Sequence, residues 1–154
     1  MRINPSVLDR LIDHDPEGRY EPPASRLGSQ RQLKQAVRRD LEWLLNTRRV
    51  ASGIPPGLKE VSQSVAAYGL PDFSTVNVRS PLAQNEIRRA IEEAIRASEP
   101  RLEGVTVTLL PTPENERALH FRVDARLKIR PQPEPVAFDT MLQLSNGQCV
   151  VQEA

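Results

Sequence analysis

The stretch Ala97-Ser98-Glu99-Pro100-Arg101-Leu102 marks the point where the sequence pattern changes from helix to strand. Before it, apolar residues recur at the three- and four-residue spacing of a helix that begins at Ser80-Pro81. Pro100 ends that helix, because proline has no N–H for the helical ladder and its ring clashes with the preceding turn. After it, apolar and polar residues alternate, as in strands with one buried face. The stretch therefore separates a helical half of the chain from a sheet.

Alternating apolar residues predict four strands in the second half of the chain. They span residues 105–110, 119–129, 136–144 and 148–152. The last two strands are joined at Asn146-Gly147, a dipeptide typical of tight hairpins. In the register that we expect, Leu142 lies opposite Val151 on the apolar face, and Asp139 pairs with Arg126 on the polar face. The sequence therefore predicts a four-stranded antiparallel β-meander with one buried face.

Helices are predicted to cover that apolar face. A long one begins at Ser29, which forms a capping-box pattern with Gln32, and its apolar residues keep helical spacing as far as Asn46. The helix that ends at the junction is the second. Shorter helices are expected after Asn4-Pro5 and over 61–68. The predicted fold class is therefore α+β, with helices packed on one face of the sheet.

The composition is that of an ordinary globular protein, and we expect residues 1–154 to form a single domain. Residues 14–28 contain several prolines and glycines and are predicted to be a flexible connection. The net charge is only +1 and no basic block is present, so no nucleic-acid partner is expected. No apolar run reaches the roughly 18 residues of a membrane span. With one cysteine and no hydrophobic signal region, the chain is expected to be cytoplasmic.

The sequence holds no pattern that predicts catalysis or a cofactor. His14 and His120 lack the spacing of metal ligands, and no glycine-rich phosphate loop is present, so neither a metal nor a cofactor is expected. Cys149 falls on the apolar face of the sheet, where a thiol is a core residue rather than a nucleophile. The acids available to a glycosidase are Glu99, Glu103, Asp124 and Asp139. We therefore expect that this chain is not an enzyme.

Two charged residues flank Pro100 at the junction. Glu99 lies at the C-terminal end of the helix, where the helix dipole disfavours a carboxylate by about 0.3–1 kcal/mol. Arg101 follows on an arm whose direction the proline fixes. One interpretation is that both charges are simply solvated. The other is that they meet a partner, since residues placed against a local rule concentrate at functional sites.

Five stretches of the sequence, taken in order, resemble the TssE baseplate subunits of bacterial type VI secretion systems. They are Pro5–Leu11, Arg39–Arg48, Tyr68–Phe73, Glu99–Leu102 and Pro135–Thr140. That family belongs to the baseplate-wedge proteins of contractile phage tails, whose members often carry a lysozyme-like label. The resemblance covers nearly the whole chain. Ser98 departs from it, because a bulky apolar residue, commonly Phe, is expected before Glu-Pro-Arg-Leu.

This resemblance implies a structural role without catalysis. Such subunits help the contractile sheath to start polymerising, so the implied partners are other baseplate wedge subunits and sheath proteins. The family fold resembles a sheath domain in which neighbours add strands, which implies that the sheet edges 105–110 and 148–152 are open to strand addition. By carry-over, the partner-binding residues are Glu99, Pro100, Arg101 and Leu102, with charge-assisted contacts from the two charged ones. The alternative, suggested by the lysozyme-like label, is a peptidoglycan hydrolase.

Overall fold

The structure is a computed structural model that describes residues 6–12, 26–49, 54–55, 57–62, 64–73, 76–77, 80–111, 118–129, 131–143 and 147–154. Its elements are, in order, α1 (Val7–Leu11), α2 (Arg26–Asn46), α3 (Lys59–Ser62), the 3₁₀ helix η1 (Val65–Ala67), α4 (Pro81–Ser98), β1 (Leu102–Leu110), β2 (Ala118–Leu127), β3 (Glu134–Gln143) and β4 (Cys149–Glu153). Helix gives way to strand at the predicted junction.

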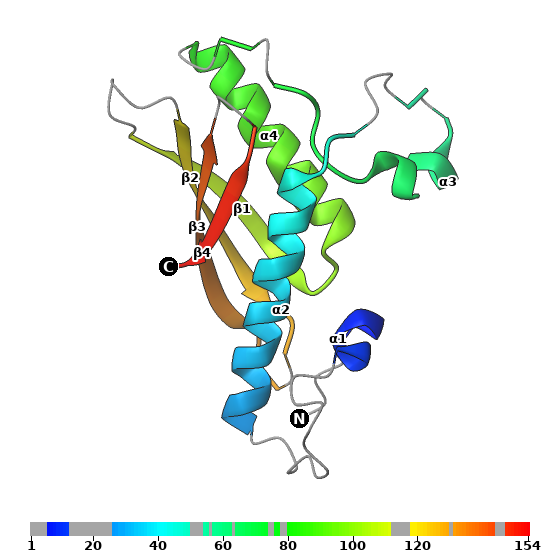
Figure 1. The fold of residues 1–154 in the computed structure, drawn as a ribbon, viewed down its shortest axis with the longest axis vertical. Helices are drawn as coiled ribbons and strands as arrows, with labels where there is room; N and C mark the ends of the chain where they lie inside the picture. Colours follow the sequence, from blue (N-terminus) through cyan, green and yellow to red (C-terminus); the bar gives the residue numbers. More distant parts are fainter. Residues whose placement is uncertain are drawn as a thin grey trace.

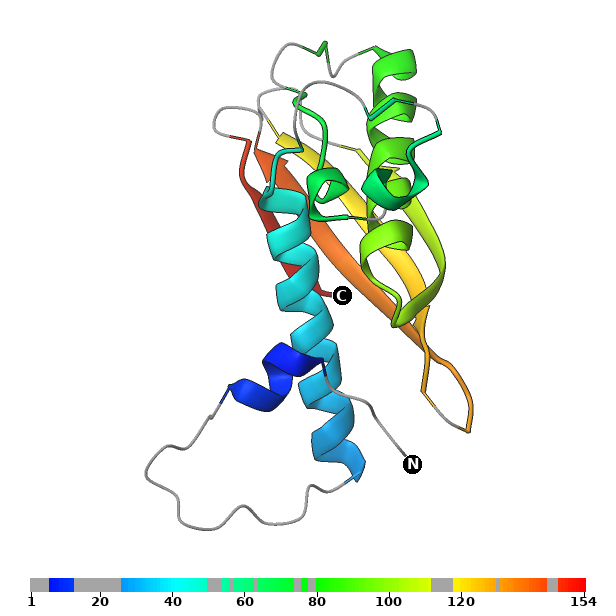
Figure 2. The ribbon, with the colours of Figure 1, turned by 90° about the vertical axis from the view of Figure 1, so that its right-hand side faces the viewer.

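The four strands form one antiparallel sheet in the order β1-β2-β3-β4, and α2 and α4 cover one of its faces (Figures 1 and 2). The α+β prediction is therefore confirmed. Apolar side chains of the two helices and the sheet meet in a core whose largest fully buried members include Phe121, Phe138 and Ile91. By contrast, α3 and η1 contribute no buried residue and lie apart from the sheet in Figure 1. Among the described helices, none is long and apolar enough to cross a membrane.

The strands present the predicted faces, but their register differs from the prediction. Leu142 lies opposite Cys149 rather than Val151, and Asp139 lies opposite Arg122 rather than Arg126. The reason for the first difference is the length of the hairpin connection. The N–H of Gln143 donates to the carbonyl oxygen of Gln148, so the connection between the last paired residues has four residues, 144–147. The prediction gave it two residues, Asn146 and Gly147. Shifts by an even number of residues keep every side chain on its face.

Two helix predictions also need correction. The long helix begins at Arg26, so residues 26–28 of the predicted connection 14–28 are helical, while 14–25 lie outside the described residues. A glycine inside a helix costs only about 1 kcal/mol relative to alanine, so Gly28 does not stop a helix of 21 residues. The predicted helix 61–68 is divided into α3 and η1.

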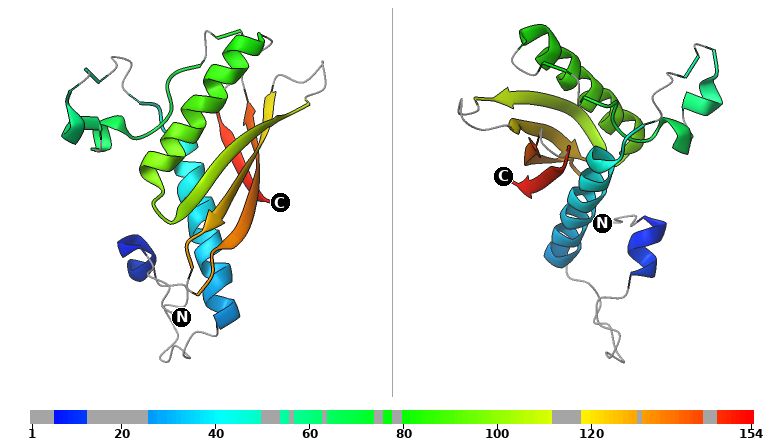
Figure 3. Two further views of the ribbon diagram at one scale, coloured as in Figure 1. Left: turned by 180° about the vertical axis from the view of Figure 1, so that it is seen from behind. Right: turned by 45° about the horizontal axis from the view of Figure 1, so that its top comes forward.

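The sheet edges are β1 and β4, as predicted, but they are not open along their length. Helix side chains form hydrogen bonds with backbone groups of both edges. On β1, Arg96 of α4 binds Val105 and Glu92 of α4 binds Val107. On β4, Arg38 of α2 binds Val151 and Asn46 of α2 binds Cys149. The expectation of open edges is wrong at these four strand residues. The physical reason is that α4 packs against β1, at one edge of the sheet, and α2 packs against β4, at the other edge (Figure 3).

Candidate functional site

Glu99 and Arg101 bind each other at the predicted junction. The N–H of Glu99 still makes a helical hydrogen bond, to the carbonyl oxygen of Ile95, but Pro100 has no N–H to continue the ladder, so α4 ends here. The Glu99 side chain is only 5% exposed. Beyond Pro100 the chain turns back, and Arg101 donates to Glu99 Oε1 from its backbone N–H (3.1 Å) and from Nε (2.7 Å). Its Nη2 donates to Glu99 Oε2. The carboxylate that opposes the helix dipole thus has its partner two residues away, and the solvated interpretation is wrong.

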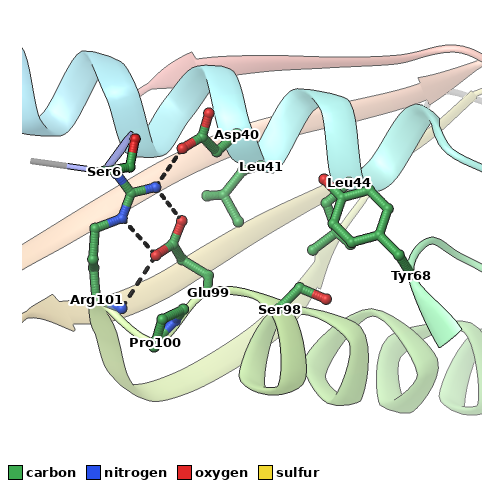
Figure 4. Close-up of a pocket in the computed structure, with 9 residues that line it drawn as sticks. All are labelled: Ser6, Asp40, Leu41, Leu44, Tyr68, Ser98, Glu99, Pro100 and Arg101. Carbon is green, nitrogen blue, oxygen red and sulfur yellow. Dashed lines mark hydrogen bonds and ion pairs between the residues drawn. The ribbon is translucent and has the colours of Figure 1, made fainter. Parts of the chain in front are cut away.

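Helix α2 adds a second acid and a second arginine to this pair. Asp40 accepts from Arg101 Nη2 through Oδ2, and from Arg39 Nε and Nη2 through Oδ1 at 2.9 and 2.7 Å. Figure 4 shows the guanidinium of Arg101 between the carboxylates of Asp40 and Glu99. The end of α4 is therefore tied to the middle of α2 by charge-assisted hydrogen bonds, which are about twice as strong as neutral ones.

Helix α1 completes the cluster with Asp9. Its Oδ1 accepts from Arg39 Nη2 at 2.7 Å, and its Oδ2 lies 3.4 Å from Arg101 Nη1. Asp9 also forms a capping box with Ser6: the Asp9 N–H donates to Ser6 Oγ, and the Ser6 N–H donates to Asp9 Oδ2. One side chain thus both begins α1 and holds it to the rest of the protein.

The orientation of α1 is the reverse of that of an ordinary amphipathic helix. Its acid points inward and is 13% exposed, whereas Val7 and Leu11 are 74% and 76% exposed. A helix of five residues contributes little stability of its own, so its contacts with the protein decide how it lies. The ion pairs of Asp9 fix that orientation and leave an apolar ridge, Val7 and Leu11, facing solvent.

Asp9 and Arg101 of the cluster have shifted pKa values, and both shifts favour the charged form. Burial raises the pKa of Asp9, but hydrogen bonds from Ser6 and Arg39 outweigh that effect, and the pKa lies below its ordinary value. Burial lowers the pKa of Arg101, but its contacts with Glu99 and Asp40 outweigh that effect and raise the value. A general acid needs a raised carboxyl pKa, so Asp9 is not suited to that role.

A pocket of about 370 Å³ lies beside the cluster, between α2 and the end of α4. It is lined by Ser6, Asp40, Leu41, Leu44, Tyr68, Ser98, Glu99, Pro100 and Arg101 (Figure 4). Burial, together with the negative charges of Asp40 and Glu99, raises the pKa of Tyr68. Ser98, where the resemblance leads us to expect a bulky apolar residue, is one of the lining residues. The lining thus combines apolar side chains, Leu41 and Leu44, with charged ones, Asp40, Glu99 and Arg101.

Two further residues considered for catalysis have contacts within the fold. Cys149 is 2% exposed, and burial together with the charge of Glu42 raises the pKa of its thiol to about 12, so it is a core residue as predicted. Asp139 pairs with Arg122 at 2.7 Å. Among the residues that the structure describes, no three potential ligands form a metal site. Trp43, 49% exposed, lies beneath the guanidinium of Arg39, 5.0 Å from the ring centroid.

The periodicity of the sequence did not identify Asp9, Arg39 and Asp40 as part of the site. A signal was present, however, in the stretches that carried the resemblance. Pro5–Leu11 contains Asp9, Arg39–Arg48 contains Arg39 and Asp40, and Tyr68–Phe73 contributes Tyr68 to the pocket. Four of the five stretches, including the junction itself, therefore meet at this one place.

Comparisons with known proteins agree with this picture. Residues 31–132 match the family described as Baseplate wedge protein gp25. A chain in a solved structure, "The baseplate complex from the type VI secretion system", has a similar fold, with a TM-score of 0.52 and 20% sequence identity. That similarity covers 75% of this chain and 98% of the other. A search of curated proteins found no match.

Proposed function

The chain belongs to the family of baseplate wedge protein gp25, and from that premise we propose that it is a structural subunit of a type VI secretion baseplate. In this role it anchors or nucleates the contractile sheath in the cytoplasm, through contacts with wedge and sheath proteins. The observation that carries the proposal is the family match over residues 31–132, which include the junction and the α2 part of the cluster. The fold similarity to a chain of a type VI baseplate complex supports it.

The junction Glu99–Leu102 is proposed to bind a neighbouring subunit. Glu99 and Leu102 are buried, so within this proposal they act from inside, by fixing the shape of the surface. Pro100 is exposed and Arg101 partly so, and these two are available for direct contact. The apolar ridge of α1, held by the same cluster, provides the hydrophobic part of the contact. An apolar centre with a polar rim is typical of protein interfaces.

Peptidoglycan hydrolysis has little support from the site. A glycosidase needs one carboxyl group with a raised pKa and a second a fixed distance away across a cleft. In the cluster, Asp9, Asp40 and Glu99 each accept from at least one arginine. For Asp9 these contacts lower the pKa of the carboxyl, which opposes the role of proton donor. We therefore propose that the chain is not an enzyme.

The proposed role is tested in a bacterial strain that lacks this chain, with sheath formation followed by fluorescence microscopy. Sheaths should be absent, and the wild-type protein should restore them. Normal sheath numbers without the protein would contradict the structural role. Purified protein incubated with peptidoglycan distinguishes the alternative, since turnover that Asp40→Asn abolishes would support a hydrolase.

The docking surface needs variants that leave the charge cluster intact. Arg101→Glu would place four acids together and so confuse binding with unfolding. Val7→Ser/Leu11→Ser changes only exposed side chains, and Arg122→Gln, on the polar face of the sheet, is a control for a surface change away from α1. We expect the double variant to lose capture of wedge subunits in co-purification and the control to keep it. Full capture by the double variant would remove α1 from the proposed surface.

A further inference from the structure

The outer edge of β4 is occupied by the side chain of Asn46, at the end of α2. Asn46 Oδ1 accepts from the N–H of Cys149, and Asn46 Nδ2 donates to the carbonyl oxygen of the same residue, both at 2.8 Å. These are the two bonds that a hydrogen-bonded residue of an adjacent antiparallel strand would make. The amide of Asn46 thus takes the place of a fifth strand at this position.

Arg38 extends the cover along the same edge. It lies two turns before Asn46 on α2, and its Nη1 donates to the carbonyl oxygen of Val151 at 3.1 Å. Gln148 and Ala154 bond to β3, so the alternate residues Cys149 and Val151 direct their backbone groups away from the sheet. One face of α2 therefore meets two successive outward-facing residues of β4.

The edge at β1 is protected by a related arrangement and by a bulge. Arg96 Nη2 donates to the carbonyl oxygen of Val105 at 2.6 Å, and Glu92 Oε1 accepts from the N–H of Val107 at 2.9 Å. Next to them, the pairing with β2 shifts between Glu103 and Thr106, and Gly104 adopts φ +63°. A bulge twists an edge strand and hinders its pairing with another strand.

We propose that Asn46 and Arg38 are latches that keep β4 from pairing with β4 of a second copy of this chain. An antiparallel edge is complementary to itself: a two-fold axis through Val151 would place Cys149 of one copy opposite Glu153 of the other. Unlike β1, β4 pairs with its neighbour in an unbroken register, so no bulge protects it. The latches are its protection, and this inference does not depend on a baseplate role.

The Asn46 latch is replaceable because Asn46 is exposed and its contacts are neutral hydrogen bonds to backbone. An incoming strand offers the same donor and acceptor, so the bonds that it makes match those that Asn46 gives up. Hydrogen bonds to an incoming strand are therefore no weaker than those to Asn46, and pairing gains no hydrogen-bond energy while Asn46 is in place. The latch removes the unpaired N–H and C=O groups that would otherwise attract a strand.

Sedimentation velocity over a range of concentrations tests the proposal. Asn46→Ala/Arg38→Ala should self-associate at least about tenfold more tightly than wild type. Gln35→Ala, an exposed change on the same helix, should behave as wild type. Circular dichroism and thermal melting establish that each variant is folded. Arg38→Ala alone, which uncovers Val151 without touching the end of α2, replaces the double variant if the latter does not fold.

Hydrogen exchange at the Cys149 amide identifies the surface that associates. This amide should be protected in wild type, exposed in the dilute Asn46→Ala variant, and protected again when that variant is concentrated. Equal self-association of wild type and latch variants would overturn the proposal. An association that leaves the Cys149 amide exposed would also overturn it, because another surface would then be responsible.

Discussion

Two arginines of this protein each bind a carboxylate through Nε and Nη2, one pair in a buried position and the other in an exposed one. Arg101 donates to Glu99 from Nε and Nη2 at the α4–β1 junction, and Arg122 donates to Asp139 in the same way across β2 and β3. The Glu99 side chain is 5% exposed and that of Asp139 is 41% exposed. Water screens the second pair, whereas an unpaired charge at the first has no water to replace its partner. Burial, rather than contact geometry, thus decides how much the protein depends on each pair.

Breaking the buried pair should have the largest effect. Arg101→Met keeps the length of the side chain but leaves Glu99 buried and without its main partner. We expect the free energy of unfolding to fall by about 3–5 kcal/mol, as measured by urea denaturation. A loss below about 1 kcal/mol would show that the junction behaves like a surface pair.

A double variant separates the cost of an orphaned charge from the contribution of the pair. Glu99→Leu/Arg101→Met removes both charges, and we expect it to be more stable than Arg101→Met alone, because no unpaired carboxylate remains buried. The measurement is the same urea titration. A double variant less stable than the single one would mean that Glu99 stabilises the fold without Arg101.

Releasing α1 from the cluster should have the next largest effect. Asp9→Asn removes a carboxylate that two arginines and the cap of α1 share, and we expect a loss of about 1–2 kcal/mol. Hydrogen exchange should localise the change: the Ile12 amide, which donates to Leu8 at 3.0 Å, should lose its protection. Unchanged exchange at Ile12 would show that α1 is held by other contacts.

Lowering the pH should weaken the docking of α1, as Asp9→Asn should. The pKa of Asp9 is lower in the folded protein than its ordinary value of 3.8, so its stabilising contribution is fully present above that value. It is lost as the pH falls through the lower, folded-state pKa. NMR titration of the Asp9 carboxyl carbon, in wild type and in Arg39→Met, checks the cause. We expect the arginine variant to titrate at higher pH, and identical curves would contradict the assignment.

Breaking the exposed pair should have the smallest effect. Arg122→Gln leaves Asp139 in contact with water, so we expect no measurable change in melting temperature. The pKa of Asp139, which its hydrogen bond with Arg122 now lowers, should return toward its ordinary value. A clear fall in melting temperature would break the comparison, because burial would then not separate the two pairs.

The strands show which part of a sheet can be predicted from sequence. Alternation placed Cys149 and Val151 on the core face correctly, because the side-chain period of a strand is fixed at two. It did not place them opposite the right partners, because any even shift satisfies the same alternation. The partner of Asp139 was wrong for that reason: Arg122 and Arg126 lie on the same face, and only the register chooses between them.

The charge cluster shows the corresponding limit for the site. The violation of the dipole rule at Glu99 pointed to a partner, but the sequence analysis expected that partner in a neighbouring subunit and did not predict the bond to Arg101. Asp9 and Asp40 are 92 and 61 residues from Arg101, and no local rule links residues so far apart. The edge contacts of Asn46 and Glu92 are of the same kind, since they depend on where a helix lies relative to a strand.

The sequence by itself determined the element types, the buried faces and the position of the junction, because these follow from periodicity and from the chemistry of single residues such as Pro100. The tertiary structure decided the strand register, the inward orientation of Asp9 and the covering of the sheet edges. These depend on how whole elements pack, and packing brings together groups that the chain itself keeps apart. Asp9 and Asp40 are therefore far from Arg101 in the sequence but in direct contact with it in the fold.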